Sequence, residues 1–182
     1  MKPFRMLNLS AEEDIQHIKT PILGEFPESC RFLDVGAGNG RCSIEVAMRG
    51  HIVKAVEWDP VQAIILDANI KLNGNPDIRV VRQVPVGVPG EGLLGNQRTI
   101  NQLTTGWDHW AVRLGFSAPV DELLANRNWL QIADVVIIDE WDVSNRREKW
   151  IEEFVAAGFR VDSQNTNDFR LSVKRSNLSL DV

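Results

Sequence analysis

The chain has 182 residues, of which 43% are hydrophobic and 25% charged, and its formal net charge at pH 7 is -5. This size and composition fit one soluble globular domain and argue against a disordered or fibrous chain. The acidic balance, without a long Lys/Arg run, makes nucleic acid an unlikely partner, and no apolar run approaches the roughly 20 residues needed to cross a bilayer.

The N-terminal segment, residues 1–29, is expected to flank the domain. Ser10, with Glu13 three residues later, forms a capping-box pattern that predicts a short helix from about Ala11 to Lys19. The N-terminal sequence MKPFRMLNLSAEED contains no apolar stretch followed by a small-residue cleavage site, so it does not resemble a secretory signal. We therefore expect a cytoplasmic protein.

Strands and helices are predicted to alternate over residues 31–82. Short apolar runs predict strands at Arg31–Val35, Ile52–Val56 and Ile78–Arg82, and helices at about Gly40–Arg49 and from Pro60 to the Asn73-Gly74 turn. Asp59 is the expected N-cap of the second helix. Apolar residues cover much of this helix and predict its burial against a sheet; they are Ile64, Leu66, Ala68, Ile70 and Leu72. This order, with short connections, indicates a parallel sheet with helices on its faces.

The segment from 84 to 129 is irregular, because glycines recur in it and interrupt any periodicity. Only a short helix over Pro119–Ala125 is predicted there. Since the domain has no separate substrate module, we expect this segment to carry substrate specificity.

The C-terminal part returns to a regular pattern. Ala133–Ile138 predicts a buried strand that ends at Asp139. Asn145 and Glu148 form a second capping-box pattern, which predicts a helix closed by Gly158. Phe159–Asp162 and Phe169–Lys174 predict a closing pair of strands. The expected fold is a three-layer α/β domain over residues 1–182, with a mostly parallel sheet and a C-terminal antiparallel strand.

A glycine-rich turn follows the first predicted strand, with the sequence Asp34-Val35-Gly36-Ala37-Gly38-Asn39-Gly40. The dinucleotide pattern G-x-G-x-x-G, counted from Gly36, requires glycine at the position of Arg41. The observed D-x-G-x-G-x-G suits S-adenosylmethionine, which has no phosphate and whose methionine and ribose lie against bare backbone. Asp34 would orient the turn or receive the amino group of this cofactor. A tight turn without a ligand is the competing interpretation.

Residues after the second and third predicted strands complete the expected cofactor site. Glu57 is placed where a carboxylate can accept hydrogen bonds from both ribose hydroxyls. Trp58 follows directly and would flank the adenine ring, and Gln83 and Val84 are further candidate neighbours of adenine. The competing interpretation of Glu57 is a solvated acid at a strand end.

At these residues the chain resembles the class I S-adenosylmethionine-dependent methyltransferases, and in particular the FkbM-like O-methyltransferases. The resemblance spans about residues 31–160 and rests on the segments FLDVGAGNG, VEWDP, LDANIKLNG, PVDEL and VVIID. It implies the Rossmann-like methyltransferase fold, S-adenosylmethionine as cofactor, and a hydroxyl oxygen of a small molecule or a glycan as methyl acceptor. The group usually continues after the last of these segments with a Glu-Gly pair, where this chain has Glu140 and Trp141.

Acidic residues after the strand that ends at Asp139 are the candidate catalytic groups, because ligands of parallel sheets lie beyond the carboxyl ends of the strands. Asp139 is the preferred base or acceptor-orienting residue, and Glu140 and Asp142 are further candidates. These acids can equally cap the next helix or stay in solvent. Two of them could instead hold a divalent metal that positions a diol substrate, although we assign no metal site. His109 is another candidate base.

Two other functions remain open from the sequence alone. One is a protein that binds the cofactor without catalysis, as a partner or sensor, and the other is a nicotinamide-dependent oxidoreductase. The oligomeric state is not predicted.

Overall fold

The computed structural model describes residues 31–74, 76–81, 99–104, 110–115, 118–139, 146–165 and 170–175, and for Val81, Asp139, 162–165 and 170–175 it describes the backbone alone. The predicted N-terminal helix lies outside these residues. Within them, the strands are β1 (Arg31–Val35), β2 (Ile52–Val56), β3 (Ile78–Val81), β4 (Trp110–Leu114), β5 (Ala133–Asp139), β6 (Phe159–Asn165) and β7 (Arg170–Arg175). The helices are α1 (Arg41–Met48), α2 (Pro60–Leu72), α3 (Ile100–Leu103), α4 (Val120–Ala125), the 3-10 helix η2 (Arg127–Gln131) and α5 (Arg147–Ala156).

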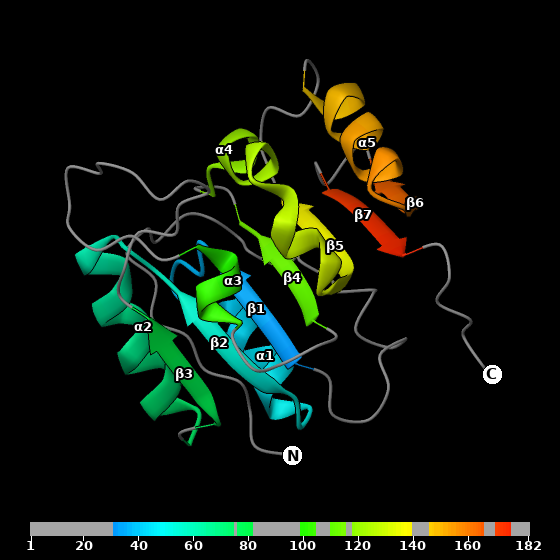
Figure 1. Cartoon of the computed structure of the whole chain (residues 1–182). Coiled ribbons are helices and arrows are strands. Elements are labelled where there is room, and N and C mark those ends of the chain that lie inside the picture. The colour runs from blue at the N-terminus through cyan, green and yellow to red at the C-terminus, as the bar shows by residue number, and fades with distance from the viewer. Residues whose placement is uncertain are drawn as a thin grey trace.

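The described strands form one sheet in the order β3-β2-β1-β4-β5-β7-β6, in which β1 lies between β2 and β4 (Figure 1). Strands β1 to β5 are parallel, and β7 runs antiparallel to both β5 and β6. The predicted mostly parallel sheet with a reversed C-terminal strand is therefore confirmed. Because the strands β1, β2, β4 and β5 run in the same direction, their carboxyl ends meet at one edge of the sheet.

Helices cover both faces of the sheet, which gives the predicted three layers. Side chains alternate across each strand, so Phe32 packs toward α1 while Leu33 packs into the larger core on the opposite face. That larger core also contains Leu123 of α4 and Trp150 of α5, both fully buried. Every residue of β4 is buried, as expected of a central strand covered on both faces.

Strand β4 corrects the interpretation of residues 84–129 as irregular. It pairs with both β1 and β5 at the centre of the sheet. The helix α3 also lies in this segment, and a capping box formed by Thr99 and Gln102 opens it. The short helix predicted over Pro119–Ala125 is confirmed as α4, with Pro119 as N-cap.

Two expectations about helices were wrong in detail. Helix α2 begins as predicted, with Asp59 as N-cap and Pro60 at the first position, but its outer side is solvent-exposed. Ile64 is 66% exposed and Leu72 45% exposed, because the sheet-facing side consists of Ala63, Leu66 and Asn69. Helix α5 begins after Arg146 without a side-chain cap, so the predicted capping box is not its start, and Asn145 lies outside the described residues. Among the helices that the structure describes, none is long and apolar enough to span a bilayer.

Candidate functional site

Residues 36–40 connect β1 to α1 at the carboxyl edge of the sheet and form a tight loop. Gly36, Gly38 and Gly40 all have left-handed backbone conformations, with φ angles of 74°, 57° and 84°, which favour glycine. The N–H groups of Gly36 and Ala37 both donate to the carbonyl oxygen of Val56, each at 3.0 Å. The loop is thereby fixed over the end of β2.

The glycines around this loop serve different steric purposes. A Cβ on Gly40 would lie 2.0 Å from Leu66 Cδ1, so glycine here allows α2 to pack against the loop. A Cβ on Gly115, at the end of β4, would lie 2.4 Å from the carbonyl oxygen of Gly36. At Gly38, by contrast, an added Cβ would meet no atom of the described residues within 4 Å. With respect to the described part of the chain, open space therefore borders the bare backbone at Gly38.

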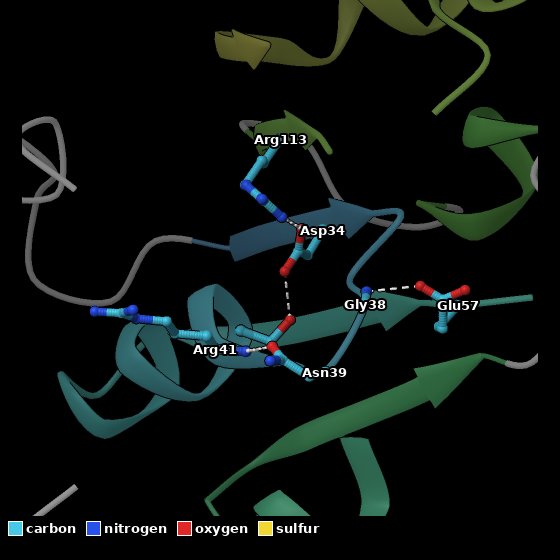
Figure 2. Close-up of polar contacts among 7 residues, drawn as sticks. Asp34, Gly38, Asn39, Arg41, Glu57 and Arg113 are labelled. Atoms are coloured by element: carbon cyan, nitrogen blue, oxygen red, sulfur yellow. Dashed lines mark hydrogen bonds and ion pairs between the residues drawn. The ribbon is translucent and has the colours of Figure 1, made fainter. Parts of the chain in front are cut away.

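Glu57 follows β2, and its side chain faces the loop at Gly38 (Figure 2). Its side chain accepts a hydrogen bond from the Gly38 N–H at Oε2 (2.6 Å) and from the Asp59 N–H at Oε1 (2.8 Å). The residue is 2% exposed, so a solvated acid is excluded. A carboxylate offers about four lone-pair sites, so two bonds leave capacity for further donors. Asp59 in turn caps α2 by accepting from the N–H groups of Val61 and Gln62.

Asp34 lies beneath the loop and is fully buried. Its Oδ2 accepts from the Ser43 hydroxyl and its Oδ1 contacts Arg113 Nη1, both at 2.6 Å. These contacts connect the end of β1 to α1 and β4, and the two roles predicted for Asp34 both stay predictions. Arg113 was missed from the sequence, because its strand was missed.

Two further loop residues, Ala37 and Asn39, contact side chains of α2. The side chain of Ala37 packs with Ala55 and Leu66, so any ligand contact of Ala37 would come from its backbone. Asn39 Oδ1 accepts from the Arg41 N–H at 3.2 Å, and the Asn39 carbonyl accepts from Asn69 Nδ2 at 2.8 Å. Asn69 was also missed; its only signal in the sequence is a polar residue between the apolar positions of the helix.

The predicted adenine neighbours are only partly described. Trp58 is partly buried and packs against the larger core, and its contact with adenine stays a prediction. Gln83 and Val84 lie outside the described residues, where β3 has ended at Val81.

The candidate catalytic residues are mostly outside the described residues. Asp139 is the last residue of β5, at the same edge as the glycine loop, and only its backbone is described. Glu140, Asp142 and His109 lie outside the described residues. Trp110, which follows His109 in the chain, begins β4 beside Arg31 and thus lies at the opposite edge. Within the described ranges, no three His, Cys, Asp or Glu side chains gather as a metal site would require.

A polar cluster connects α4 with α5 on the larger-core face. Asp121 accepts hydrogen bonds from Trp150 Nε1 and Lys149 Nζ, each at 3.1 Å, and from Arg146 Nη1 at 3.3 Å. The bond from the Trp150 indole and those from the two cations lower the pKa of Asp121, against the opposing effect of burial. The start of α4 is thereby tied to the start of α5, close in sequence to Asp139.

Several solved structures with a similar fold are methyltransferases, and another is a protein of the NADB-Rossmann superfamily from Streptococcus agalactiae, which aligns with a TM-score of 0.60 and 18% identity, covering 96% of this chain and 73% of that one. A precorrin-6y C5,15-methyltransferase from Geobacter metallireducens GS-15 aligns with a TM-score of 0.61 and 13% identity over 92% of this chain and 91% of that one. A ribosomal protein L11 methylase from Lactobacillus delbrueckii subsp. bulgaricus aligns with a TM-score of 0.58 and 18% identity, covering 86% and 77%. TrmK of M. capricolum, in complex with S-adenosyl-homocysteine, aligns with a TM-score of 0.54 and 14% identity, covering 86% and 66%.

No family model and no curated protein sequence matches the chain. At such low identities the structural likeness establishes the fold, which is the Rossmann-like fold of these methyltransferases. The comparisons give no support to the FkbM-like group in particular.

Proposed function

We propose that the chain is an S-adenosylmethionine-dependent methyltransferase whose cofactor lies against residues 36–40 and Glu57. The observation that carries this proposal is the pairing of a buried Glu57 carboxylate with the Gly38 N–H, beside a stretch of backbone that no described residue covers at Gly38. The shared fold supports it, since one similar structure holds S-adenosyl-homocysteine. The missing glycine at Arg41 argues against a dinucleotide.

The described residues fit such a cofactor. Each oxygen of Glu57 accepts one backbone N–H and keeps a lone pair, so the carboxylate suits two neighbouring hydroxyl donors such as those of a ribose. The bound cofactor would supply a methyl group already activated by its sulfonium. The protein's own task is then to hold the acceptor near that methyl group and to exclude competing water.

The acceptor that we propose is a hydroxyl of a small molecule or a glycan. The resemblance to the FkbM-like enzymes supports oxygen as acceptor, and the net charge of -5 disfavours nucleic acid. Asp139 would orient this hydroxyl or take its proton, because it ends a strand at the same edge as the glycine loop. Glu140 and Asp142, which come next in the sequence, are the other candidates for this role.

Isothermal titration calorimetry with S-adenosyl-homocysteine and with NADH tests the cofactor. We expect binding of the first only, and we expect Glu57→Gln to lower its affinity by tenfold or more, on the order of the loss of one charged hydrogen bond. Glu153→Gln is the matched control, because Glu153 lies on α5 and pairs with Arg127 at 2.7 Å. Binding of NADH alone would overturn the proposal.

Turnover separates a methyltransferase from a cofactor-binding partner protein. Transfer of a tritiated methyl group from S-adenosylmethionine to a panel of phenols and sugars is the measurement. We expect Asp139→Ala to abolish transfer and to leave S-adenosyl-homocysteine affinity unchanged. Full activity of this variant would remove Asp139 from the catalytic residues.

A further inference from the structure

The sheet-facing side of α2 contains one fully buried asparagine. Ala63, Leu66 and Asn69 are the buried residues of this helix, and Asn69 is the polar one among them. Burying an amide costs roughly 1–3 kcal/mol unless its hydrogen bonds are made. An apolar residue would suit this side of the helix better if packing were the only requirement.

A hydrogen bond from the Asn69 side chain is directed at the glycine loop. Its Nδ2 donates to the carbonyl oxygen of Asn39 at 2.8 Å, across 30 positions in the sequence. On the other side of the same peptide group, the Gly40 N–H donates to the carbonyl oxygen of Ala37 at 3.0 Å. Both polar atoms of the Asn39-Gly40 peptide are therefore held, and the orientation of this peptide is fixed.

The orientation of this peptide matters because its neighbours are glycines. Gly38 and Gly40 have φ angles of 57° and 84° and, being glycines, can also adopt many other conformations at little cost. A loop of this kind keeps one conformation only if outside groups hold it. Asn69 holds the Asn39-Gly40 peptide, whose N–H donates to the carbonyl oxygen of Ala37 in the peptide that carries the Gly38 N–H. It thereby helps to keep the Gly38 N–H aimed at Glu57.

We infer that Asn69 is a positioning residue for the cofactor loop, acting through the Asn39 carbonyl without touching the cofactor. This inference rests on the proposed function, since the loop must be the one that binds the cofactor. It predicts that loss of the Asn69 donor raises the conformational freedom of residues 36–40 in the free protein. Binding must then order the loop again, which weakens affinity.

Asn73 provides a matched control on the same helix. It is the C-cap residue of α2, and its Nδ2 donates to the carbonyl oxygen of Asn69 at 2.8 Å, a bond made within the helix. Asn73→Ala therefore perturbs the end of α2 while leaving the Asn69 side chain and its bond to the loop in place.

Three variants of Asn69 distinguish the effect of losing the hydrogen-bond donor from the effect of changing the side-chain volume. Asn69→Leu keeps a similar volume without a donor, and Asn69→Ala removes both. Asn69→Asp is isosteric, and its carboxyl group can donate only when protonated. Lowering the pH from 8 toward about 5 favours the protonated carboxyl group in Asn69→Asp. We therefore expect the ratio of its affinity for S-adenosyl-homocysteine to that of the original chain, measured at each pH, to rise as the pH is lowered.

The experiment combines calorimetry with S-adenosyl-homocysteine and hydrogen exchange of the Gly38 and Gly40 amides by NMR without ligand. We expect Asn69→Leu and Asn69→Ala to lower affinity about tenfold, as the loss of one buried hydrogen bond implies, and to accelerate exchange at both amides. Asn73→Ala should do neither. Unchanged exchange and affinity in Asn69→Leu and Asn69→Ala, or equal losses in Asn73→Ala, would overturn the inference. If the original chain does not bind the compound, the proposed function fails, and the exchange data still decide whether Asn69 holds the loop.

Discussion

Arg113 and Asp34 form a buried ion pair between the two central strands, with 2.6 Å between Nη1 and Oδ1. The two residues are direct neighbours in the register of β4 and β1, and their side chains are 7% and 0% exposed. Ser43, on α1, adds a hydrogen bond from its hydroxyl group to the Asp34 carboxylate. Asp34, Ser43 and Arg113 thus form a small buried polar network next to the glycine loop, within an otherwise apolar sheet.

Arg113→Met is expected to destabilise the protein by about 3–5 kcal/mol. The substitution removes one partner of a buried pair and leaves the Asp34 carboxylate without its cation in a site of low polarity. Urea unfolding followed by circular dichroism measures the free energy of unfolding.

The double variant Arg113→Met with Asp34→Asn supplies the control for that prediction. It removes the stranded charge as well, and the asparagine can still accept from Ser43, so a large part of the lost stability should return. A double variant as unstable as Arg113→Met, or a loss below about 1 kcal/mol in the single variant, would contradict the charge-pair explanation.

The same pair explains why β4 was not predicted from the sequence. The strand is only five residues long and has Arg113 inside it, so it does not form an uninterrupted apolar run. The arginine is buried because a partner 79 positions away lies opposite, and a local pattern does not contain that information. By contrast, Arg31–Val35, Ile52–Val56 and Ala133–Ile138 were predicted, because their apolar runs and flanking turns are local signals.

In the candidate site, too, the residues with a local sequence signal were predicted, and those whose role depends on distant contacts were missed. The glycine loop and Glu57 were predicted from spacing, since each lies directly after a strand. Asn69 was missed because its role depends on where α2 crosses the loop. The exposed outer side of α2 was missed for a related reason: composition shows that a helix is apolar, and only the packing shows which side faces the sheet.

Gly38→Val is expected to block cofactor binding while the fold persists. Gly38 has a φ angle of 57° and no described residue lies within 4 Å of an added Cβ, so a side chain would occupy the volume next to the bare backbone and strain a left-handed conformation. Gly50→Val is the matched control, because Gly50, just after α1, also has a left-handed φ angle, of 93°, and no described residue within 4 Å of an added Cβ.

Both valine variants should lose roughly 1–3 kcal/mol of unfolding free energy. Only Gly38→Val should lose S-adenosyl-homocysteine binding in calorimetry. Undiminished affinity in Gly38→Val would show that the cofactor does not lie on this loop.

Gly115→Ala is expected to destabilise the protein through a backbone clash. The added Cβ would lie 2.4 Å from the carbonyl oxygen of Gly36, and this oxygen belongs to a loop whose N–H groups are fixed to Val56. Since the contact is with backbone, it cannot be relieved by a side-chain rotation, and a loss of about 1–3 kcal/mol should follow.

Gly74→Ala is the control that measures the stability lost on replacing a glycine where no backbone clash is expected. A Cβ on Gly74 would meet no atom of the residues that the structure describes within 4 Å, although its φ angle of 84° carries a strain of its own. Differential scanning calorimetry and S-adenosyl-homocysteine titration should show that Gly115→Ala weakens both stability and affinity, whereas Gly74→Ala lowers stability alone. Full affinity in Gly115→Ala would mean that the end of β4 does not position the loop.

The Asp121 cluster predicts how acid affects the contact between α4 and α5. Hydrogen bonds from Trp150 and from the two cations hold the pKa of Asp121 below its ordinary value of 3.8, so the folded state favours the carboxylate. Its contribution to stability is therefore complete above 3.8 and is lost as the pH falls through the lowered folded-state pKa. Asp121→Asn keeps an acceptor for the indole but removes the charge that the cations face.

We expect Asp121→Asn to be less stable than the original chain by up to about 1 kcal/mol near pH 6, a small loss because the ion pairs are partly exposed. The difference should shrink as urea unfolding is repeated at pH values stepping down below 3.8. Glu122→Gln, at the next position of α4 and exposed to solvent, should change stability by less than about 0.5 kcal/mol at every pH. A difference for Asp121→Asn that stays constant, or grows, as acid is added would show that the carboxylate charge does not connect the two helices.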